Sequence, residues 1–402
     1  DDDAAAVIAA SLSEMENITH ADLSDVIAGR PEEMALNVLS ILSRSLKERR
    51  LLSLDLSDNA MGEKGILACK GLLENQRNSL ESLSMCNNGL SGSAMELIKQ
   101  IVIGETPQKS PLKKLHFFNN MSGNTGAKAL ADMLPLCSKL ENLRFSSTRA
   151  LFEGSLIFLE SLAECPAVKN GQLTHLDLAD NTFRTEGGLL LAKILIQQKG
   201  LVYLSLRDCS LEDSGCILLI ESLKGMDRLE YLDLSANELT TKTAICLRNV
   251  LPSLTSLKVL AIEENDEIGS KGAIHISRGL EECNDSKLVR LSLNMCGIGE
   301  RGGVCLAQSV NNLNSLNKLE LNENKLSEDA IADIKEILES FGKCSVLGEM
   351  DENEFESEDE EGSEEETHET SSSEANEVQE LASALVISCC SLHCFGSGLS
   401  KM

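Results

Sequence analysis

Apolar residues recur along most of the chain in the pattern L-x-x-L-x-L-x-x-N, in which x is mostly polar. The alternating L-x-L core predicts a short strand with one buried face, because side chains alternate sides along a strand. The segments that follow carry apolar residues at three- and four-residue spacing, which predicts an amphipathic helix. We therefore expect one strand and one helix in each unit.

The last position of the pattern marks ten clear units, 28 to 33 residues apart, and a degenerate earlier unit ends at Val26. A period of this length with a full helix is typical of long leucine-rich repeats. The expected fold is an α/β solenoid, a ribonuclease-inhibitor-like horseshoe or crescent with parallel strands on the concave face and helices on the convex face. The ten positions are Asn59, Asn88, Asn120, Thr148, Asn181, Cys209, Asn237, Asn265, Cys296 and Asn324.

Asparagine dominates this last position, and we expect it to be structural there. Its side chain can bond backbone groups of neighbouring turns, which have no other partner inside a stacked solenoid. The residues to which this role is assigned are Asn59, Asn88, Asn120, Asn181, Asn237, Asn265 and Asn324.

The repeat predicts one domain over residues 1–345, although a length of 402 would ordinarily suggest several domains. Residues 346–380 are acidic and rich in Ser and Glu, so they cannot bury enough apolar surface to fold. Fifteen acidic residues and no Lys or Arg lie between 351 and 380, which is more than half of the net charge of −28. Residues 381–402 form a short apolar extension, but Ser, His and Gly interrupt it, so we do not expect it to contact a membrane.

Charge and motifs exclude several classes of function. An acidic chain is a poor partner for nucleic acid, whose binding depends on Lys and Arg, and it fits a basic protein better. The sequence contains no P-loop, no H-E-x-x-H and no paired C-x-x-C at zinc spacing. We therefore expect no cofactor, no metal and no active site belonging to the chain itself.

The residue just before the final Asn of each unit is expected to face solvent, on the rim of the solenoid. The N-terminal part of this column contains mainly acidic residues and two asparagines. Its members are Asp25, Asp58, Asn87, Asn119, Ser147 and Asp180. The fold does not require Asn87, so its amide is expected to be free to touch a partner. Arg30 is an exposed cation in an acidic neighbourhood, and the alternative is that it forms only a surface salt bridge.

Three segments carry a resemblance to a known family: ADLSDVIAGRPEEMALNVL, LLSLDLSDNAMGEKGI and FFNNMSGNTGAKALADMLPLC. Together they resemble the GTPase-activating proteins of the small nuclear GTPase Ran, most closely the plant branch, over roughly residues 4–345. Two features depart from that pattern. The N-terminal targeting domain of plant members, with its Trp-Pro-Pro motif, is missing from this Trp-free sequence, and the apolar C-terminal extension has no counterpart.

The resemblance implies a catalytic accessory that orders Ran's own catalytic Gln and switch regions instead of inserting an arginine finger. Asn87 matches the residue that contacts that Gln, and Arg30 matches an Arg that docks or orders a switch segment. Asp25, Asp58, Asn119 and Asp180 are assigned to partner binding, with the carboxylates steering association.

The same resemblance implies a cellular role and partners. The partner would be Ran in its GTP-bound form, together with a Ran-binding co-activator. The protein would act as a monomer in nucleocytoplasmic transport, in the cytoplasm and at the cytoplasmic side of the nuclear envelope.

Two other classes remain open. A stoichiometric inhibitor of the ribonuclease-inhibitor type uses the same long repeat, but it is richer in Cys and Trp and lacks the D-L-S-D…G-R segment. A fragment of an innate-immunity receptor would be the third class, although no nucleotide-binding module accompanies the repeats.

Overall fold

A computed structural model describes residues 1–104 and 108–354 of the chain. The segment predicted to be an acidic tail, 346–380, therefore falls mostly outside the described residues, and the apolar extension 381–402 lies wholly outside them. The chain divides into two compact units, Asp1–Phe183 and Arg184–Met402.

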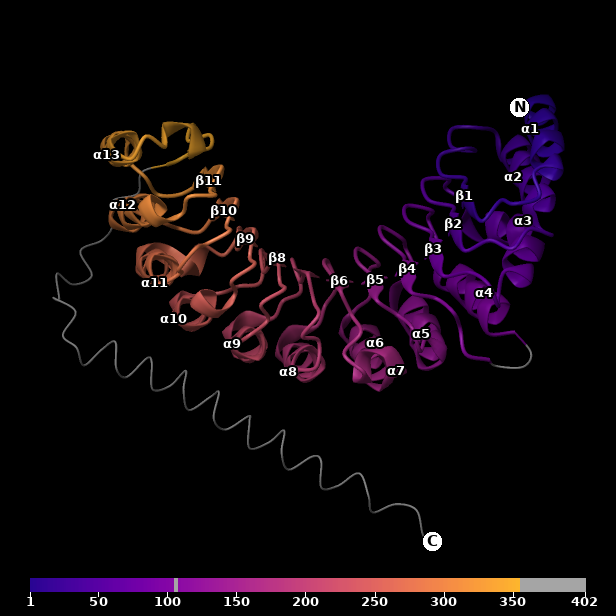
Figure 1. The fold of residues 1–402 in the computed structure, drawn as a ribbon, viewed down its shortest axis with the longest axis horizontal. Coiled ribbons are helices and arrows are strands. Elements are labelled where there is room, and N and C mark those ends of the chain that lie inside the picture. Colours follow the sequence, from indigo (N-terminus) through magenta and orange to yellow (C-terminus); the bar gives the residue numbers. More distant parts are fainter. Residues whose placement is uncertain (105–107, 355–402) are drawn as a thin grey trace, which may run out of the picture. The chain divides into compact units, whose positions relative to one another are not determined.

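In the first unit, short parallel strands alternate with helices, and strand order follows the sequence from β1 to β6. The strands lie along one side of the unit and the helices along the other (Figure 1). The elements are α1 (Asp2–Glu14), β1 (His20–Asp22), α2 (Glu32–Leu46), β2 (Ser53–Asp55), α3 (Gly62–Asn75), β3 (Ser82–Ser84), α4 (Gly92–Ile103), β4 (Lys114–His116), α5 (Gly123–Met133), η1 (Leu134–Leu136), β5 (Asn142–Arg144), α6 (Phe152–Glu164), α7 (Pro166–Lys169) and β6 (His175–Asp177).

The second unit repeats this architecture with parallel strands β7 to β11 (Figure 1). Short 3-10 helices follow several of its α-helices and tighten the return to the next strand. The elements are α8 (Arg184–Leu195), β7 (Tyr203–Ser205), α9 (Glu212–Ser222), β8 (Tyr231–Asp233), α10 (Thr241–Val250), η2 (Leu251–Ser253), β9 (Val259–Ala261), η3 (Asp266–Ile268), α11 (Gly269–Glu281), β10 (Arg290–Ser292), α12 (Glu300–Ser309), η4 (Val310–Asn312), β11 (Lys318–Glu320), α13 (Glu328–Ser340) and η5 (Cys344–Val346).

In the core of each unit, the central leucines of neighbouring strands are in register and lie side by side on the same face of the sheet. Side chains on either side of each leucine point to the opposite face of the sheet, because side chains alternate along a strand. This arrangement confirms the predicted α/β leucine-rich repeat fold, including a strand for the degenerate first unit. The aligned leucines, all at most 1% exposed, are Leu54, Leu83, Leu115, Leu143 and Leu176 in the first unit and Leu204, Leu232, Leu260, Leu291 and Leu319 in the second.

The asparagines that end the repeats are buried and tie successive turns together. The Asn59 amide nitrogen donates to the carbonyls of Leu23, Leu56 and Ser57, and its oxygen accepts from the backbone N–H groups of Val26 and Ile27. Buried backbone groups left without a partner are costly, and Asn59 supplies such partners to two successive turns.

The repeat bonding continues past the boundary that the sequence predicts at residue 345. Leu347 forms a parallel bridge with Leu319, and the Glu354 N–H donates to the Asn324 carbonyl. Asn353 accepts from the Asn324 N–H at 2.8 Å, so it occupies the next position of the asparagine ladder. A partial further turn therefore covers the end of β11.

Candidate functional site

The column of residues just before the asparagine ladder has an unusual backbone. All eleven members lie in the left-handed region, with φ between 52° and 61°. Asn and Asp tolerate this region better than most residues. The preference for Asp and Asn on the rim is therefore partly a backbone requirement. The members are Asp25, Asp58, Asn87, Asn119, Ser147, Asp180, Asp208, Ala236, Glu264, Met295 and Glu323.

Backbone conformation alone does not dictate the amides at 87 and 119. Ala236, Met295 and Glu264 adopt the same left-handed φ without an amide. The side chains at 87 and 119 thus need a second explanation, and their surroundings supply one.

Asn87 lies at the centre of a line of three hydrogen-bonded rim side chains. Its Nδ2 donates to Asp58 Oδ1 at 2.9 Å, and its Oδ1 accepts from Asn119 Nδ2 at 3.0 Å. All three residues are exposed. The Asn87 amide is therefore bonded within the rim, because neighbouring parallel strands lie about 4.8 Å apart, which brings successive rim side chains within bonding reach.

The amide of Asn87 still has capacity for a partner. A primary carboxamide has two N–H donors and two acceptor lone pairs. The two rim bonds use one donor and one lone pair, so one of each is left at an exposed position.

The remaining rim residues predicted for partner binding lie at the ends of this line. Asp25 follows β1, one strand before Asp58, and Asp180 follows β6, two strands beyond Asn119. Both side chains are exposed. The structure therefore joins three of the predicted rim residues by hydrogen bonds and arranges the other two along the same edge.

Arg30 sits in the turn between β1 and α2. Gly29 has a φ of +70°, which allows the tight turn that exposes the arginine. The Arg30 Nε donates to the Val26 carbonyl at 3.1 Å, which holds the start of the side chain against the turn. The turn also bonds to Asn59, the neighbour of the rim residue Asp58.

A groove of about 470 Å³ opens beside Arg30. The turn after β1 forms one wall and the loop that leads into α3 forms the other, with Lys64 paired to Glu32 at 2.6 Å. The groove is thus part of the same edge as the rim. Its lining includes Ile27, Gly29, Arg30, Asn59, Ala60 and Met61.

The sheet face behind the rim carries an ordered set of polar side chains. Arg144 stacks 3.7 Å from the ring centre of Phe118 and pairs with Asp177 at 2.8 Å, which holds the residue next to Asn119. His116 bonds Asn142 at 2.6 Å, and burial lowers its pKa to about 4. The His116 ring is therefore neutral near pH 7.

The sheet face of the second unit carries a polar cluster that sequence reasoning missed. Tyr203 and Tyr231 stack with ring centres 4.3 Å apart. Further along, Glu320 receives Arg290 and Lys318, each at 2.5 Å. For the tyrosine pair the signal was available, because residues one repeat apart at the same strand position are neighbours on the sheet.

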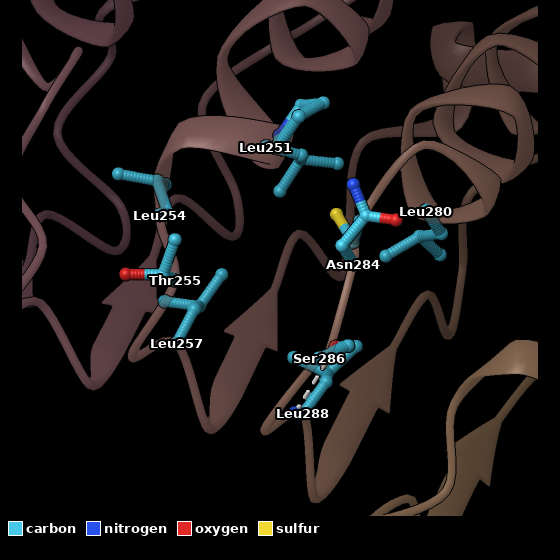
Figure 2. Close-up of a pocket in the computed structure, with 10 residues that line it drawn as sticks. Leu251, Leu254, Thr255, Leu257, Leu280, Asn284, Ser286 and Leu288 are labelled. Carbon is cyan, nitrogen blue, oxygen red and sulfur yellow. Dashed lines mark hydrogen bonds between the residues drawn. The ribbon is translucent and has the colours of Figure 1, made fainter.

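A small pocket lies elsewhere in the second unit. A pocket of about 20 Å³ lies between the end of η2 and the loop after α11 (Figure 2). Leu251, Leu254 and Leu257 line one side, and Leu280 and Leu288 the other. Such a volume has room for about one water molecule.

Two further findings concern the described residues alone. They contain no group of His, Cys, Asp or Glu side chains arranged to hold a metal ion. Among these same residues, no helix has both the length and the apolar character needed to cross a bilayer.

The fold and its rim define a leucine-rich repeat protein of the α/β type, and the Leucine Rich repeat family matches residues 49–68, 170–192, 253–277 and 284–307. A solved structure agrees with the fold. The crystal structure of the Rad7 and Elc1 complex in yeast matches with a TM-score of 0.54 and 17% identity, over 87% of this chain and 82% of that chain.

Part of the chain is similar to particular proteins. It is 48% identical over 81 residues to RAN GTPase-activating protein 1 of Arabidopsis thaliana, which is 20% of this chain and 15% of the relative. RAN GTPase-activating protein 2 of the same plant is 50% identical over 68 residues, and Ran GTPase-activating protein 1 of Xenopus laevis is 39% identical over 67. Each of these two matches covers 17% of this chain and 12% of the relative, so every match spans only a fraction of the relative's length.

Proposed function

We propose that this protein accelerates GTP hydrolysis by the small GTPase Ran. The observation that carries the proposal is the similarity of a stretch of the chain, at 39–50% identity, to three Ran GTPase-activating proteins. The exposed rim supports it, because Asn87 offers a donor and an acceptor at a position held by two hydrogen bonds.

In this mechanism the chain supplies no active site of its own. Small GTPases use a glutamine to orient the attacking water, and activators lower the barrier by ordering that machinery and stabilising charge. Asn87 would bond the carboxamide of Ran's catalytic Gln and so restrict it to the productive orientation. Arg30 would dock a switch segment beside the groove at the start of α3.

Electrostatics would contribute mainly to the association rate. Asp25, Asp58 and Asp180 lie along one exposed edge and would attract a basic surface of the partner. The proposal extends to the GTP-bound form of Ran, a Ran-binding co-activator, a monomeric activator, and a role in nucleocytoplasmic transport in the cytoplasm near the nuclear envelope.

The test is multiple-turnover GTP hydrolysis by Ran with this protein at sub-stoichiometric concentration. An activator turns over, so each molecule should promote hydrolysis on many Ran molecules. A stoichiometric inhibitor or a binding fragment would give no more than one event per molecule. Absence of any acceleration at equimolar protein, with Ran shown to be GTP-loaded, would reject the proposal.

A further inference from the structure

The line of side chains Asp58–Asn87–Asn119 has a chemical direction. An ionised carboxylate only accepts hydrogen bonds, so the bond between Asp58 and Asn87 must be donated by the Asn87 Nδ2. The Oδ1 of Asn87 then faces the other neighbour, and Asn119 Nδ2 donates to it. The oxygen and nitrogen of an amide are similar in size, so packing does not distinguish them, but this hydrogen-bond network does.

Turning the Asn87 amide by half a turn would break both bonds at once. Its oxygen would face the Asp58 carboxylate, and its NH₂ group would face the NH₂ group of Asn119. Both contacts are repulsive and unsatisfied, whereas an isolated exposed amide could turn at little cost.

We propose that Asp58 and Asn119 are positioning residues, which hold the carboxamide of Asn87 in one of its two orientations. This rests on the proposed function, and it assigns the pair a role different from direct partner contact. The held amide presents one N–H and one lone pair, a donor and an acceptor that match a primary carboxamide such as a Gln side chain.

The fold does not require these three side chains. The rim backbone is held by its own bonds, from the Asp58, Asn87 and Asn119 N–H groups to carbonyls of the next turn at 2.7–3.1 Å. The same backbone carries Ala236 and Met295 elsewhere, as well as Ser147 in the first unit. Substitutions that keep polar side chains on the rim should therefore leave the fold intact.

The sharpest test reverses the direction of the network without changing its charge. In the double variant Asp58→Asn/Asn119→Asp, Asn at 58 donates to the Asn87 oxygen and Asp at 119 accepts from its nitrogen. The amide is again held by two bonds but in the opposite orientation. Net charge, side-chain volume and the number of hydrogen bonds stay as in the parent protein.

The measurement is the kcat and KM of Ran GTP hydrolysis, with thermal unfolding as the folding control. We expect kcat to fall at least about tenfold, the rate equivalent of roughly one hydrogen bond, with KM and the melting temperature near the parent values. The single variant Asn119→Asp should lose kcat to a similar extent, because two acceptors then flank the amide. Ala236→Asp, which adds the same charge at the same backbone position in the second unit, should remain as active as the parent.

The outcomes separate this inference from the proposed function. If Asn87→Ala abolishes activation while the reversed double variant is fully active, the positioning role is wrong and the proposed function stands. A rise in KM with unchanged kcat would show that Asp58 and Asn119 bind the partner directly, which also overturns the inference. If Asn87→Ala itself has no effect, both are rejected.

Discussion

The rims of the two units share a backbone but differ in chemistry. Rim φ values are 52–61° in the first unit and 53–56° in the second, so the same left-handed turn recurs throughout. In the first unit this turn carries a bonded line of Asp58, Asn87 and Asn119. In the second unit Ala236 and Met295 cannot form such bonds, and Glu264 is instead drawn into an ion pair with Arg207.

This difference separates what the repeat requires from what it permits. A left-handed residue is needed at every turn, and many side chains satisfy that need at modest cost. The first unit uses the column to build a bonded polar edge of Asp58, Asn87 and Asn119, in the same unit as the turn that exposes Arg30. Function is therefore best sought where neighbouring rim side chains bond one another.

The largest expected effect follows from removing the centre of that edge. Asn87→Ala and Arg30→Ala should each slow activated hydrolysis by about two orders of magnitude or more, the size seen when a transition-state contact is lost. Met295→Ala, at the matching rim position of the second unit, should have no effect on the rate. Single-turnover hydrolysis by GTP-loaded Ran measures all three, and circular dichroism checks the fold.

Equal rates for Asn87→Ala, Arg30→Ala and the parent protein would remove the functional distinction between the two rims. A loss confined to Arg30→Ala would move the site to the groove beside α3. Either result can be interpreted without a folding defect, because Ala236 shows that the rim backbone accommodates alanine.

The next effect concerns stability, and it should be shared by both units. Asn88→Ala leaves the buried Asn59 N–H without the acceptor that Asn88 provides, and it removes one of the two amide donors to the Leu56 carbonyl. We expect the free energy of unfolding to fall by about 1–3 kcal/mol, the cost of unsatisfied buried polar groups. Urea denaturation measures it, and Asn237→Ala in the second unit is the matched comparison.

If Asn88→Ala lost activation at unchanged stability, the separation between ladder and rim would be wrong. The two asparagines are adjacent in sequence, yet one is fully buried and the other exposed. Substituting one asparagine should therefore lower activity, whereas substituting its neighbour should lower stability.

The sequence predicts the fold well because the repeat is a local code. Leucine spacing determines which side chains are buried, and the ladder position identifies residues such as Asn59 and Asn88 whose burial the structure bears out. The final turn is missed because its leucine positions are degenerate, although Asn353 follows Asn324 by one ordinary repeat length. The leucine pattern does not reveal this turn, because the turn is attached through the side-chain amide of Asn353.

The rim itself could be predicted only in part. The residues Asp58, Asn87 and Asn119 can be named from the column, but their mutual bonding cannot be read from each position taken singly. It depends on the spacing of parallel strands and on the left-handed backbone that directs successive side chains along one line. The direction of the amide follows only once both neighbours are known.

A smaller effect tests the polar cluster on the sheet face of the second unit. Glu320 is 8% exposed, and although burial raises its pKa, hydrogen bonds from Lys318, Ser292 and Arg290 outweigh this and lower it. A carboxyl whose pKa is lower in the folded state stabilises the protein above its unfolded-state pKa of about 4.5, and this contribution is lost as pH falls through the folded value.

Glu320→Gln should therefore reduce stability near pH 7 by about 1 kcal/mol, the usual net value of such a bond, and weaken the acid dependence below about pH 4.5. Melting temperatures between pH 3 and pH 7 measure both. Ran hydrolysis should be unaffected, which would keep this cluster apart from the rim of the first unit. An unchanged acid profile would mean that the Glu320 carboxyl is not the group that titrates.

The smallest effect addresses the comparison most directly. If the left-handed backbone alone selected asparagine, Ala236→Asn in the second unit should stabilise the protein by up to about 1 kcal/mol, because Asn tolerates this region better than Ala. It should bring no activity, since neither neighbour, Asp208 nor Glu264, can donate to its oxygen as Asn119 donates to Asn87. Denaturation and hydrolysis measured on the one variant thus separate backbone preference from the bonded edge. A gain in activation would show that any rim amide suffices, and the contrast between the two units would then lie in Arg30 and its groove.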